Sequence, residues 1–444
     1  MSIISANIPY RINKSVYAIF IFYISIFYLF PLIINSIYPD EYALLYVGTK
    51  SKLAFLLVPL FLALIYLMDL TVPNLRIIDF RLLGKLFENK WFNSILVLGF
   101  LLLAVNFSLK YSLTFRQTHE TSIIAAGPEV IVMLALRSYA TVYMVYILLK
   151  RMNSLTVFRY QKNLLIVITV AFVITITGST DMLFILLPLL LIFNRERLLF
   201  VKQTERKTNA AVAFFKGLVI IVLLVILVIA VVFVGNANKM GMDETIAMFT
   251  NKENINLIVV ATSLRLSNWY ASLLALGSHN LFDNTLAFKT ISGIFGNFFY
   301  QVGSMTGLGG TKPEVWSASR MSYLQTYVDL GNDTTGSSPG LIASSLYIPF
   351  FPLGMFVLSF YALVILRNLS KAFNATNIKL NGLAMIILIF FITAFFDSPL
   401  DMLNIFNPAV VIAVFFLAAT NNIAYLKLKK IKEENNNINP AIYT

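Results

Sequence analysis

The chain has 444 residues, of which 58% are hydrophobic and only 12% are charged. Soluble globular domains carry about 25% charged residues, so this composition excludes an ordinary soluble protein. The chain has no cysteine and two histidines, which excludes disulfides, thiolate metal sites and histidine-rich zinc or iron sites.

Hydrophobic runs of roughly membrane-spanning length follow one another along the chain. About 20 apolar residues cross a hydrocarbon core of about 30 Å as a helix. The first run is too long for a cleavable signal peptide, so we interpret it as a retained signal anchor. The fifth and sixth are short and form a hairpin across a tight turn at 178–181. We predict an all-α integral membrane protein with ten spans, at 17–38, 53–70, 93–109, 128–149, 163–177, 182–193, 217–235, 343–366, 382–396 and 409–426.

The distribution of lysine and arginine predicts the orientation of these spans. Most of the 34 basic residues fall in segments that share a side with the N-terminus, and such segments are cytoplasmic by the positive-inside rule. The same rule explains the net charge of +13 without a nucleic-acid partner. Both termini are therefore expected in the cytoplasm. The chain divides into membrane domain 1–235, a large outer loop 236–342, membrane domain 343–426 and a solvated cytoplasmic tail 427–444.

The outer loop contains a mostly apolar stretch, 255–276, that resembles an eleventh span. It includes Arg265 and Asn268, and another crossing would move the basic tail outside. We expect a helix at the outer interface, with its apolar face toward lipid or the helix bundle. The rest of the loop is rich in aromatic residues and glycine, which predicts an ordered cap over the membrane domain.

Several basic residues of this loop form a candidate anion site. Arg265 and Trp269 are four residues apart, so they share a helix face. A guanidinium can donate two parallel hydrogen bonds to phosphate oxygens, and a neighbouring indole can stack on a sugar. The same spacing also suits a helix that lies among lipid headgroups. Lys312 and Arg320 lie further along the loop.

Arg137 lies near the middle of the fourth span, where an arginine costs about 2.5–3.5 kcal/mol on the insertion scale. Glu129 is eight residues away, which is about 12 Å along a helix and too far for a direct pair. Either a structural partner on another helix or an anionic substrate would explain this arginine. His279 and Asp283 are four residues apart and could share a face, whereas no other outer carboxylate stands out by its spacing.

Three segments resemble those of a known family. They are the turn Thr177-Gly-Ser-Thr180, the stretch Ser263-Leu-Arg265-Leu-Ser-Asn-Trp269, and Gly336-Ser-Ser-Pro-Gly340-Leu-Ile-Ala-Ser-Ser345 running into Phe351-Pro-Leu-Gly354. With the topology, they resemble Wzy-type O-antigen and oligosaccharide repeat-unit polymerases, especially those of enterobacterial common antigen. Members often carry arginine after the glycine-rich turn, where this chain has Asp181.

The resemblance implies the fold of C-type membrane glycosyltransferases and a place in the bacterial inner membrane. It implies a metal-independent and cofactor-free enzyme that joins undecaprenyl-pyrophosphate-linked oligosaccharides into a surface polysaccharide, such as lipopolysaccharide O-antigen or capsule. A chain-length regulator protein would be a further partner. Under this resemblance the catalytic residues are Arg265 and Arg320, which grip pyrophosphate, and His279 or Asp283, which takes the acceptor proton, while Lys312, Arg137 and Trp269 bind substrate.

Three other functions stay open. A lipid-linked oligosaccharide flippase or transporter would also be basic and polytopic, but usually shows internal repeats and charged residues at mid-membrane. An O-antigen ligase would share the topology and the lipid donor. An enzyme that uses polyprenyl-phosphate sugars would depend on an acidic pair such as Asp40-Glu41. The sequence has no Walker, nucleophile-elbow, zinc-protease or dinucleotide motif, which argues against nucleotide-driven chemistry.

Overall fold

The computed structural model describes most of the chain, and the residues that it describes are overwhelmingly helical. No strand occurs among them, which confirms the all-α class for this part of the chain. The predicted hairpin turn, the sixth span, nearly all of the seventh span and Arg265 lie outside the described residues. The description covers 11–37, 52–72, 81–111, 128–153, 155–175, 233, 237, 241–250, 268–277, 279–326, 336–374 and 382–438.

Six helices in the described residues are long and apolar enough to cross a membrane. They match the first four, the eighth and the tenth predicted spans, so membrane insertion is supported while the count of ten stays a prediction. Two shorter helices, α8 (Arg159–Ile174) and α18 (Gly382–Phe396), match the fifth and ninth spans. The six are α1 (Lys14–Ile37), η1 with α3 (Lys52–Leu56 and Leu57–Thr71), α5 (Lys90–Tyr111), α7 (Pro128–Met152), α17 (Phe351–Asn374) and α19 (Pro408–Ile438).

The eighth span begins later than the sequence suggests. Residues before it form two short helices, α16 (Gly340–Ala343) and η2 (Ser344–Tyr347), and the chain then turns at Phe350, which has a φ of 63°. The helix α17 starts directly after this turn, with Pro352 in its first turn, where a missing backbone N–H is tolerated. The long helix of the eighth predicted span therefore begins eight residues after the expected boundary at 343.

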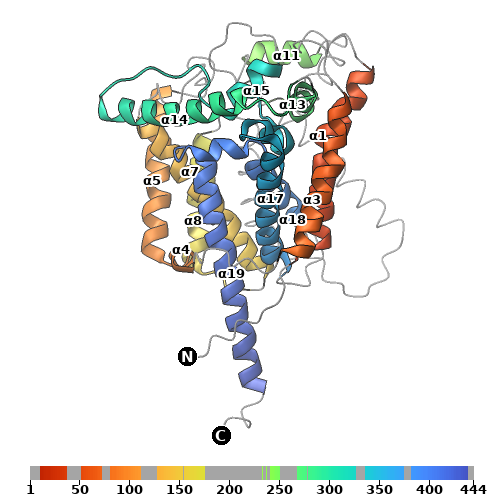
Figure 1. Ribbon diagram of the computed structural model, residues 1–444. Helices are drawn as coiled ribbons and strands as arrows, with labels where there is room; N and C mark the ends of the chain where they lie inside the picture. Colours follow the sequence, from red (N-terminus) through yellow and green to blue (C-terminus); the bar gives the residue numbers. More distant parts are fainter. Residues whose placement is uncertain are drawn as a thin grey trace. The chain divides into compact units, whose positions relative to one another are not determined.

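The last helix continues beyond the predicted end of its span. α19 runs to Ile438, so the described part of the basic tail is helical. On this extension Lys429 and Glu433 form an exposed ion pair one helical turn apart. Figure 1 shows this part of α19 projecting away from the other helices of its unit.

Among the described residues of the predicted outer loop, the helices before α16 are α11 (Met242–Thr250), α13 (Asn268–Leu276), α14 (Thr285–Thr306) and α15 (Ala318–Thr326). α14 has 22 residues, but glycine, asparagine and glutamine interrupt its apolar sequence, and it is not among the six apolar helices. Residues 269–276 of α13 are all buried. We expected the apolar face of this stretch to contact either lipid or the helix bundle. The burial of residues 269–276 favours the bundle.

The chain forms two compact units, which we describe separately. The first comprises Met1–Asn93, Arg137–Val157 and Ser263–Thr444, and the second comprises Ser94–Leu136 and Phe158–Thr262. In the second unit, Phe172 of α8 packs edge-on against Phe100 of α5, and Lys110 pairs with Glu129 at 2.6 Å. In the first unit, α17 packs against α3, α19 and η2, while α1 packs against α13 and α18.

Buried charges are paired at one end of the first unit, where α1 begins and α3 finishes. Arg367 of α17 donates from Nε to Asp69 Oδ1 at 2.8 Å, and its Nη2 donates to the backbone carbonyls of Asp69 and Val72. The backbone N–H of Ile12 also donates to the Asp69 carboxylate. Asn13 N donates to Ser370 Oγ at 2.9 Å, so the start of α1 is tied to the end of α17.

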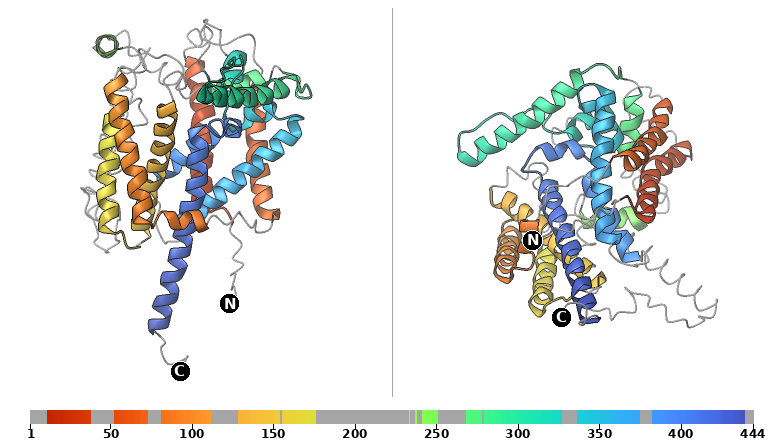
Figure 2. Two further views of the ribbon diagram at one scale, coloured as in Figure 1. Left: turned by 90° about the vertical axis from the view of Figure 1, so that its left-hand side faces the viewer. Right: turned by 60° about the horizontal axis from the view of Figure 1, so that its bottom comes forward.

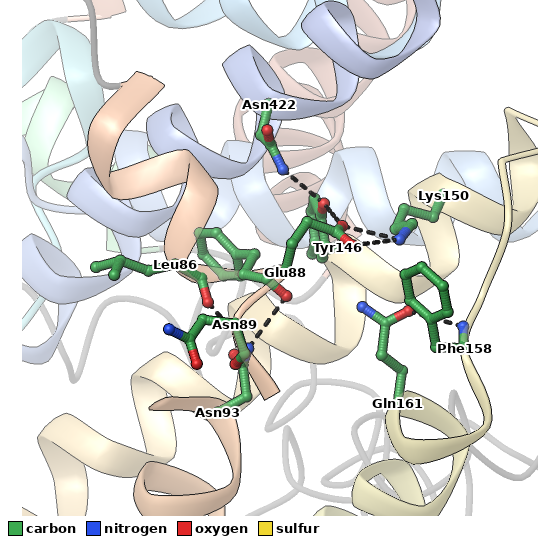
Figure 3. A network of polar contacts seen from close by, with 10 residues as sticks. Leu86, Glu88, Asn89, Asn93, Tyr146, Lys150, Phe158, Gln161 and Asn422 are labelled. Carbon is green, nitrogen blue, oxygen red and sulfur yellow. Dashed lines mark hydrogen bonds and ion pairs between the residues drawn. The ribbon is translucent and has the colours of Figure 1, made fainter. Parts of the chain in front are cut away.

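A second ion pair lies near α4 (Arg81–Leu86), which packs against α19. Lys150 of α7 donates to both carboxylate oxygens of Glu88, at 2.8 and 2.9 Å. Tyr146 donates its hydroxyl to the same carboxylate and accepts a hydrogen bond from Asn422 of α19 (Figure 3). We call Asp69, Glu88, Lys150 and Arg367 the paired-charge region.

Candidate functional site

The turn between α18 and α19 carries two aspartates four residues apart, of which Asp401 is buried and Asp397 is half-buried. We call residues 397–407 the carboxylate loop. Pro399 opens the short helix η3 (Pro399–Leu403), which places Asp397 just before it and Asp401 within it. Ser398 Oγ donates to Asp401 Oδ2 at 2.7 Å, and the backbone N–H of Asn404 donates to the Asp401 carbonyl. The loop is therefore folded tightly around Asp401.

Asp397 connects α13 and the segment that precedes α16 to this loop. Trp269 donates from Nε1 to Asp397 Oδ1 at 2.9 Å, and Ser338 donates from Oγ to Oδ2 at 2.6 Å. The backbone N–H of Gly340 donates to the Asp397 carbonyl at 2.9 Å. Segments far apart in sequence thus meet at one carboxylate.

Asp401 caps the N-terminus of α15. The backbone N–H of Ala318 donates to Asp401 Oδ1 at 2.7 Å, and Ser319 donates from Oγ to Oδ2 at 2.6 Å. The first N–H groups of a helix have no partner within the helix, and the N-terminus favours negative charge. This carboxylate therefore fixes the start of the helix that carries Arg320.

Burial raises the pKa of both carboxyl groups. It is the largest influence at each, and the charge of Asp401 raises the pKa of Asp397 further, while the hydrogen bonds from Ser338, Trp269, Ser319 and Ser398 lower the two values. The hydrogen-bond donors that the structure shows for both side chains are neutral. A carboxyl group whose pKa is moved toward neutrality is suited to proton transfer.

Trp269 is enclosed by aromatic rings of α1. Its indole is fully buried, with ring centroids of Tyr23, Phe27 and Tyr28 at 5.7, 4.8 and 6.0 Å. Gly340 has a φ of 70°, and a Cβ placed there would come within 2.6 Å of the indole. The ring thus contacts the protein on its faces, whereas the sequence suggested that it stacks on a sugar.

Arg320 is buried beside the same loop. Only 2% of its surface is exposed, its backbone N–H donates to Ser317 Oγ at 3.0 Å, and its guanidinium lies 5.4 Å from the Tyr323 ring centroid. Its neighbour Ser319 donates to Asp401. The structure therefore brings together two predicted site residues, Trp269 and Arg320, through the carboxylate loop.

His279 and Asp283 lie in the turn between α13 and α14. Asp283 is exposed, and its Oδ1 accepts hydrogen bonds from the Thr285 backbone N–H at 2.9 Å and from the Thr285 hydroxyl at 2.6 Å. These bonds, with a smaller attraction from His279, lower the pKa of Asp283. A lowered pKa weakens a general base, so the geometry favours a role for Asp283 in starting α14.

The other predicted substrate-binding residues occupy separate positions. Lys312 places its ammonium 4.7 Å from the Trp316 ring centroid, a cation–π contact. Arg137 is half-buried on α7. In the described ranges no group of three or more histidine or acidic side chains could hold a metal ion.

Sequence reasoning did not select Asp397 and Asp401, which are two among many acids of the predicted outer side. A usable signal was present. The run Asp397-Ser-Pro-Leu-Asp401 places two acids directly between hydrophobic runs in a chain with only 12% charged residues. Comparisons of the chain with protein-family models, with curated proteins and with solved structures find no match.

Proposed function

We propose that this chain is a membrane glycosyltransferase that joins undecaprenyl-pyrophosphate-linked oligosaccharide units into a surface polysaccharide, on the outer face of the bacterial inner membrane. The observation that carries the proposal is the convergence on the carboxylate loop. A buried arginine and two carboxyl groups of raised pKa come together at one end of a set of apolar helices.

The proposed reaction needs an anion-stabilising group and a proton acceptor. A hydroxyl of the incoming unit attacks the anomeric carbon of the growing chain, and the bond from that carbon to the pyrophosphate oxygen breaks. The lipid pyrophosphate leaves as an anion, which Arg320 stabilises. The hydroxyl proton passes to Asp397 or Asp401, whose raised pKa values suit this transfer. This assignment adds the two aspartates to the predicted bases His279 and Asp283.

The proposed orientation follows from the two ends of the first unit. Arg11, Lys14, Lys150 and Arg367 belong to the segments around the paired-charge region, and basic residues of this kind favour the cytoplasmic side. The carboxylate loop lies at the opposite end of these helices, where α17 and α19 begin. In this orientation the loop faces outward, where lipid-linked units would be joined.

The direct test is chain elongation by purified protein in vesicles supplied with short lipid-linked units. We expect Arg320→Ala and Asp397→Asn each to shorten or abolish the ladder of longer chains. The loss should be about tenfold to a hundredfold, because a charge-assisted hydrogen bond contributes about 1.5–3 kcal/mol. The matched control is Asp69→Asn, which alters a buried aspartate of the paired-charge region and should leave elongation by the folded protein intact.

Each outcome separates the functions that the sequence left open. Full ladders from both variants would remove these residues from the mechanism. Movement of the units across the vesicle membrane without elongation would identify a transporter. Transfer only to lipid A core would identify a ligase. Loss of activity when Asp40 and Glu41 are replaced by Asn and Gln, with Arg320→Ala and Asp397→Asn active, would favour a polyprenyl-phosphate sugar enzyme.

A further inference from the structure

α14 presents three different faces along its length. One face packs inward through Ala287 and Ile294, which are almost fully buried. A second face is built from glycines, and the chain that follows the helix returns along it. The third face exposes phenylalanines. The third face differs from the other two because about half or more of the surface of each of its phenylalanines is exposed.

The glycine face allows an extended segment to lie directly on the helix backbone. A Cβ at Gly293 would come within 1.8 Å of the Val315 carbonyl oxygen, and one at Gly303 within 2.3 Å of the Gly309 carbonyl oxygen. Residues 308–315 thus cover this side of α14, with Glu314 paired to Lys289 at 3.2 Å. No room is left there for a partner.

The phenylalanine face consists of Phe288, Phe295 and Phe299, which are 62%, 48% and 67% exposed. Their spacing of seven and four residues places them on one side of the helix. Large apolar side chains gathered on one exposed face mark a surface that binds lipid or protein.

Contacts at two points along α14 hold it beside the residues where α17 and α19 begin. At its start, Asn284 Oδ1 accepts a hydrogen bond of 2.6 Å from the backbone N–H of Phe350, the residue before α17. Further along, Gln301 Oε1 accepts one of 2.9 Å from Asn404, just before α19, and Phe298 stacks on Phe406 at 5.5 Å. α14 is therefore held at the level where two membrane-spanning candidates begin.

The views of the fold agree with these anchors. Figures 1 and 2 show α14 running crosswise beyond the starts of α17 and α19. The side chains near this level are also apolar and exposed, including Phe282 at 69%, Phe350 at 51% and Leu353 at 49%. Exposed apolar side chains thus occur both on α14 and at the start of α17, to which the beginning of α14 is hydrogen-bonded.

We infer that α14 is an interfacial helix that lies in the plane of the membrane surface, with Phe288, Phe295 and Phe299 inserted at the boundary between phospholipid headgroups and acyl chains. A helix that exposes such a face and carries an adjacent lysine suits this environment. Lipid is the occupant of this face, because α14 is bonded to the residues at which the spanning helices α17 and α19 begin.

The absence of cysteine from the sequence makes site-directed labelling clean. Single-cysteine variants Phe288→Cys, Phe295→Cys and Phe299→Cys, with Glu314→Cys as the control on the covering segment, would carry a nitroxide in vesicles of phosphatidylethanolamine and phosphatidylglycerol. We expect the three phenylalanine positions to be more accessible to oxygen, which concentrates in lipid, and Glu314→Cys to a water-soluble nickel complex.

The unmodified chain supplies a second measurement. A phospholipid with a diazirine in its acyl chain should form adducts with residues 288–299 and fewer with 308–315. Nickel accessibility at the three phenylalanine positions equal to that of the control would overturn the inference, as would adducts absent from α14. Positions accessible to neither reagent would show that protein, such as a second copy of the chain, covers this face.

Discussion

The paired-charge region and the carboxylate loop lie at opposite ends of one unit, and each contains one buried and one half-buried acidic side chain. At the first, Asp69 contacts Arg367 and Glu88 contacts Lys150. At the second, the donors seen for Asp397 and Asp401 are an indole, serine hydroxyls and backbone N–H groups. The same residue type is thus held by cations at one end and by neutral groups at the other.

This difference indicates what each region does. In the paired-charge region each carboxylate lies against a cationic side chain, and these ion pairs tie helix ends together. In the carboxylate loop, neutral donors form hydrogen bonds to the carboxylate oxygens but do not offset the full cost of removing a charge from water. The pKa values of Asp397 and Asp401 are therefore raised. We therefore interpret the first region as structural and the second as the centre of the proposed chemistry.

The largest expected effect comes from breaking a buried ion pair. Arg367→Ala leaves Asp69 buried without its guanidinium, and removal of one partner of such a pair costs about 3–5 kcal/mol. Thermal unfolding of the purified protein in detergent should show a large fall in midpoint. The exposed pair on α19 is the control, since Lys429→Ala should change stability by less than about 0.5 kcal/mol. Equal effects would contradict a structural role for the buried pair.

The next effect concerns the close packing that holds Trp269 against the carboxylate loop. Gly340→Ala should destabilise by about 1–2 kcal/mol through its left-handed backbone, and by about 1–3 kcal/mol more through displacement of the indole. Gly309→Ala is a matched control, because its φ of 72° is similar and nothing lies within 4 Å of the added Cβ. Equal unfolding midpoints for the two variants would show that the indole is not tightly held.

Trp269→Phe should have a smaller effect, because it removes the hydrogen bond to Asp397 and keeps an aromatic ring. A bond to an ionised acceptor contributes about 1.5–3 kcal/mol, and one to a neutral acceptor about 0.5–1.5 kcal/mol. Tyr23→Phe is the reference, since it removes a neutral pair with Thr393 in the same cluster. Unfolding measurements at neutral pH should give a larger loss for Trp269→Phe than for Tyr23→Phe, and a smaller loss would contradict a stabilising bond between Trp269 and Asp397.

The smallest expected effect is the pH dependence that the raised pKa of Asp397 creates. Because the folded-state pKa lies above its ordinary value, the folded chain binds this proton more tightly than the unfolded chain does. This contribution to stability is complete below the ordinary carboxyl pKa and is lost as the pH rises through the folded-state pKa. The free energy of unfolding of the natural chain, relative to that of Asp397→Asn, should therefore rise as the pH falls, which unfolding midpoints across the acid range would measure. A relative stability of the natural chain that falls on acidification would contradict the raised pKa of Asp397.

Helices were the most predictable part of this molecule. Each of the six long apolar helices lies within a few residues of a predicted span, except that α17 begins eight residues late and α19 continues to Ile438, beyond the predicted end at 426. The late start of α17 has a local cause. Residues 340–347 are apolar enough to resemble part of a span, but the chain turns after them at Phe350, which lies between two prolines. The candidate site was less predictable. Trp269 and Arg320 were selected for their chemistry, whereas Asp397 and Asp401 resembled the other acids of their side.

The sequence by itself determined that the chain is helical, apolar enough for a membrane and basic at defined turns, because these properties depend on composition and on short-range spacing. Only the tertiary structure decided which acids are buried, which of them meet cations, and that α14 runs crosswise at the level where α17 and α19 begin. Those outcomes depend on contacts between residues such as Trp269 and Asp397, which are 128 positions apart. Burial and pairing of charge arise from such distant neighbours, and no local pattern records them.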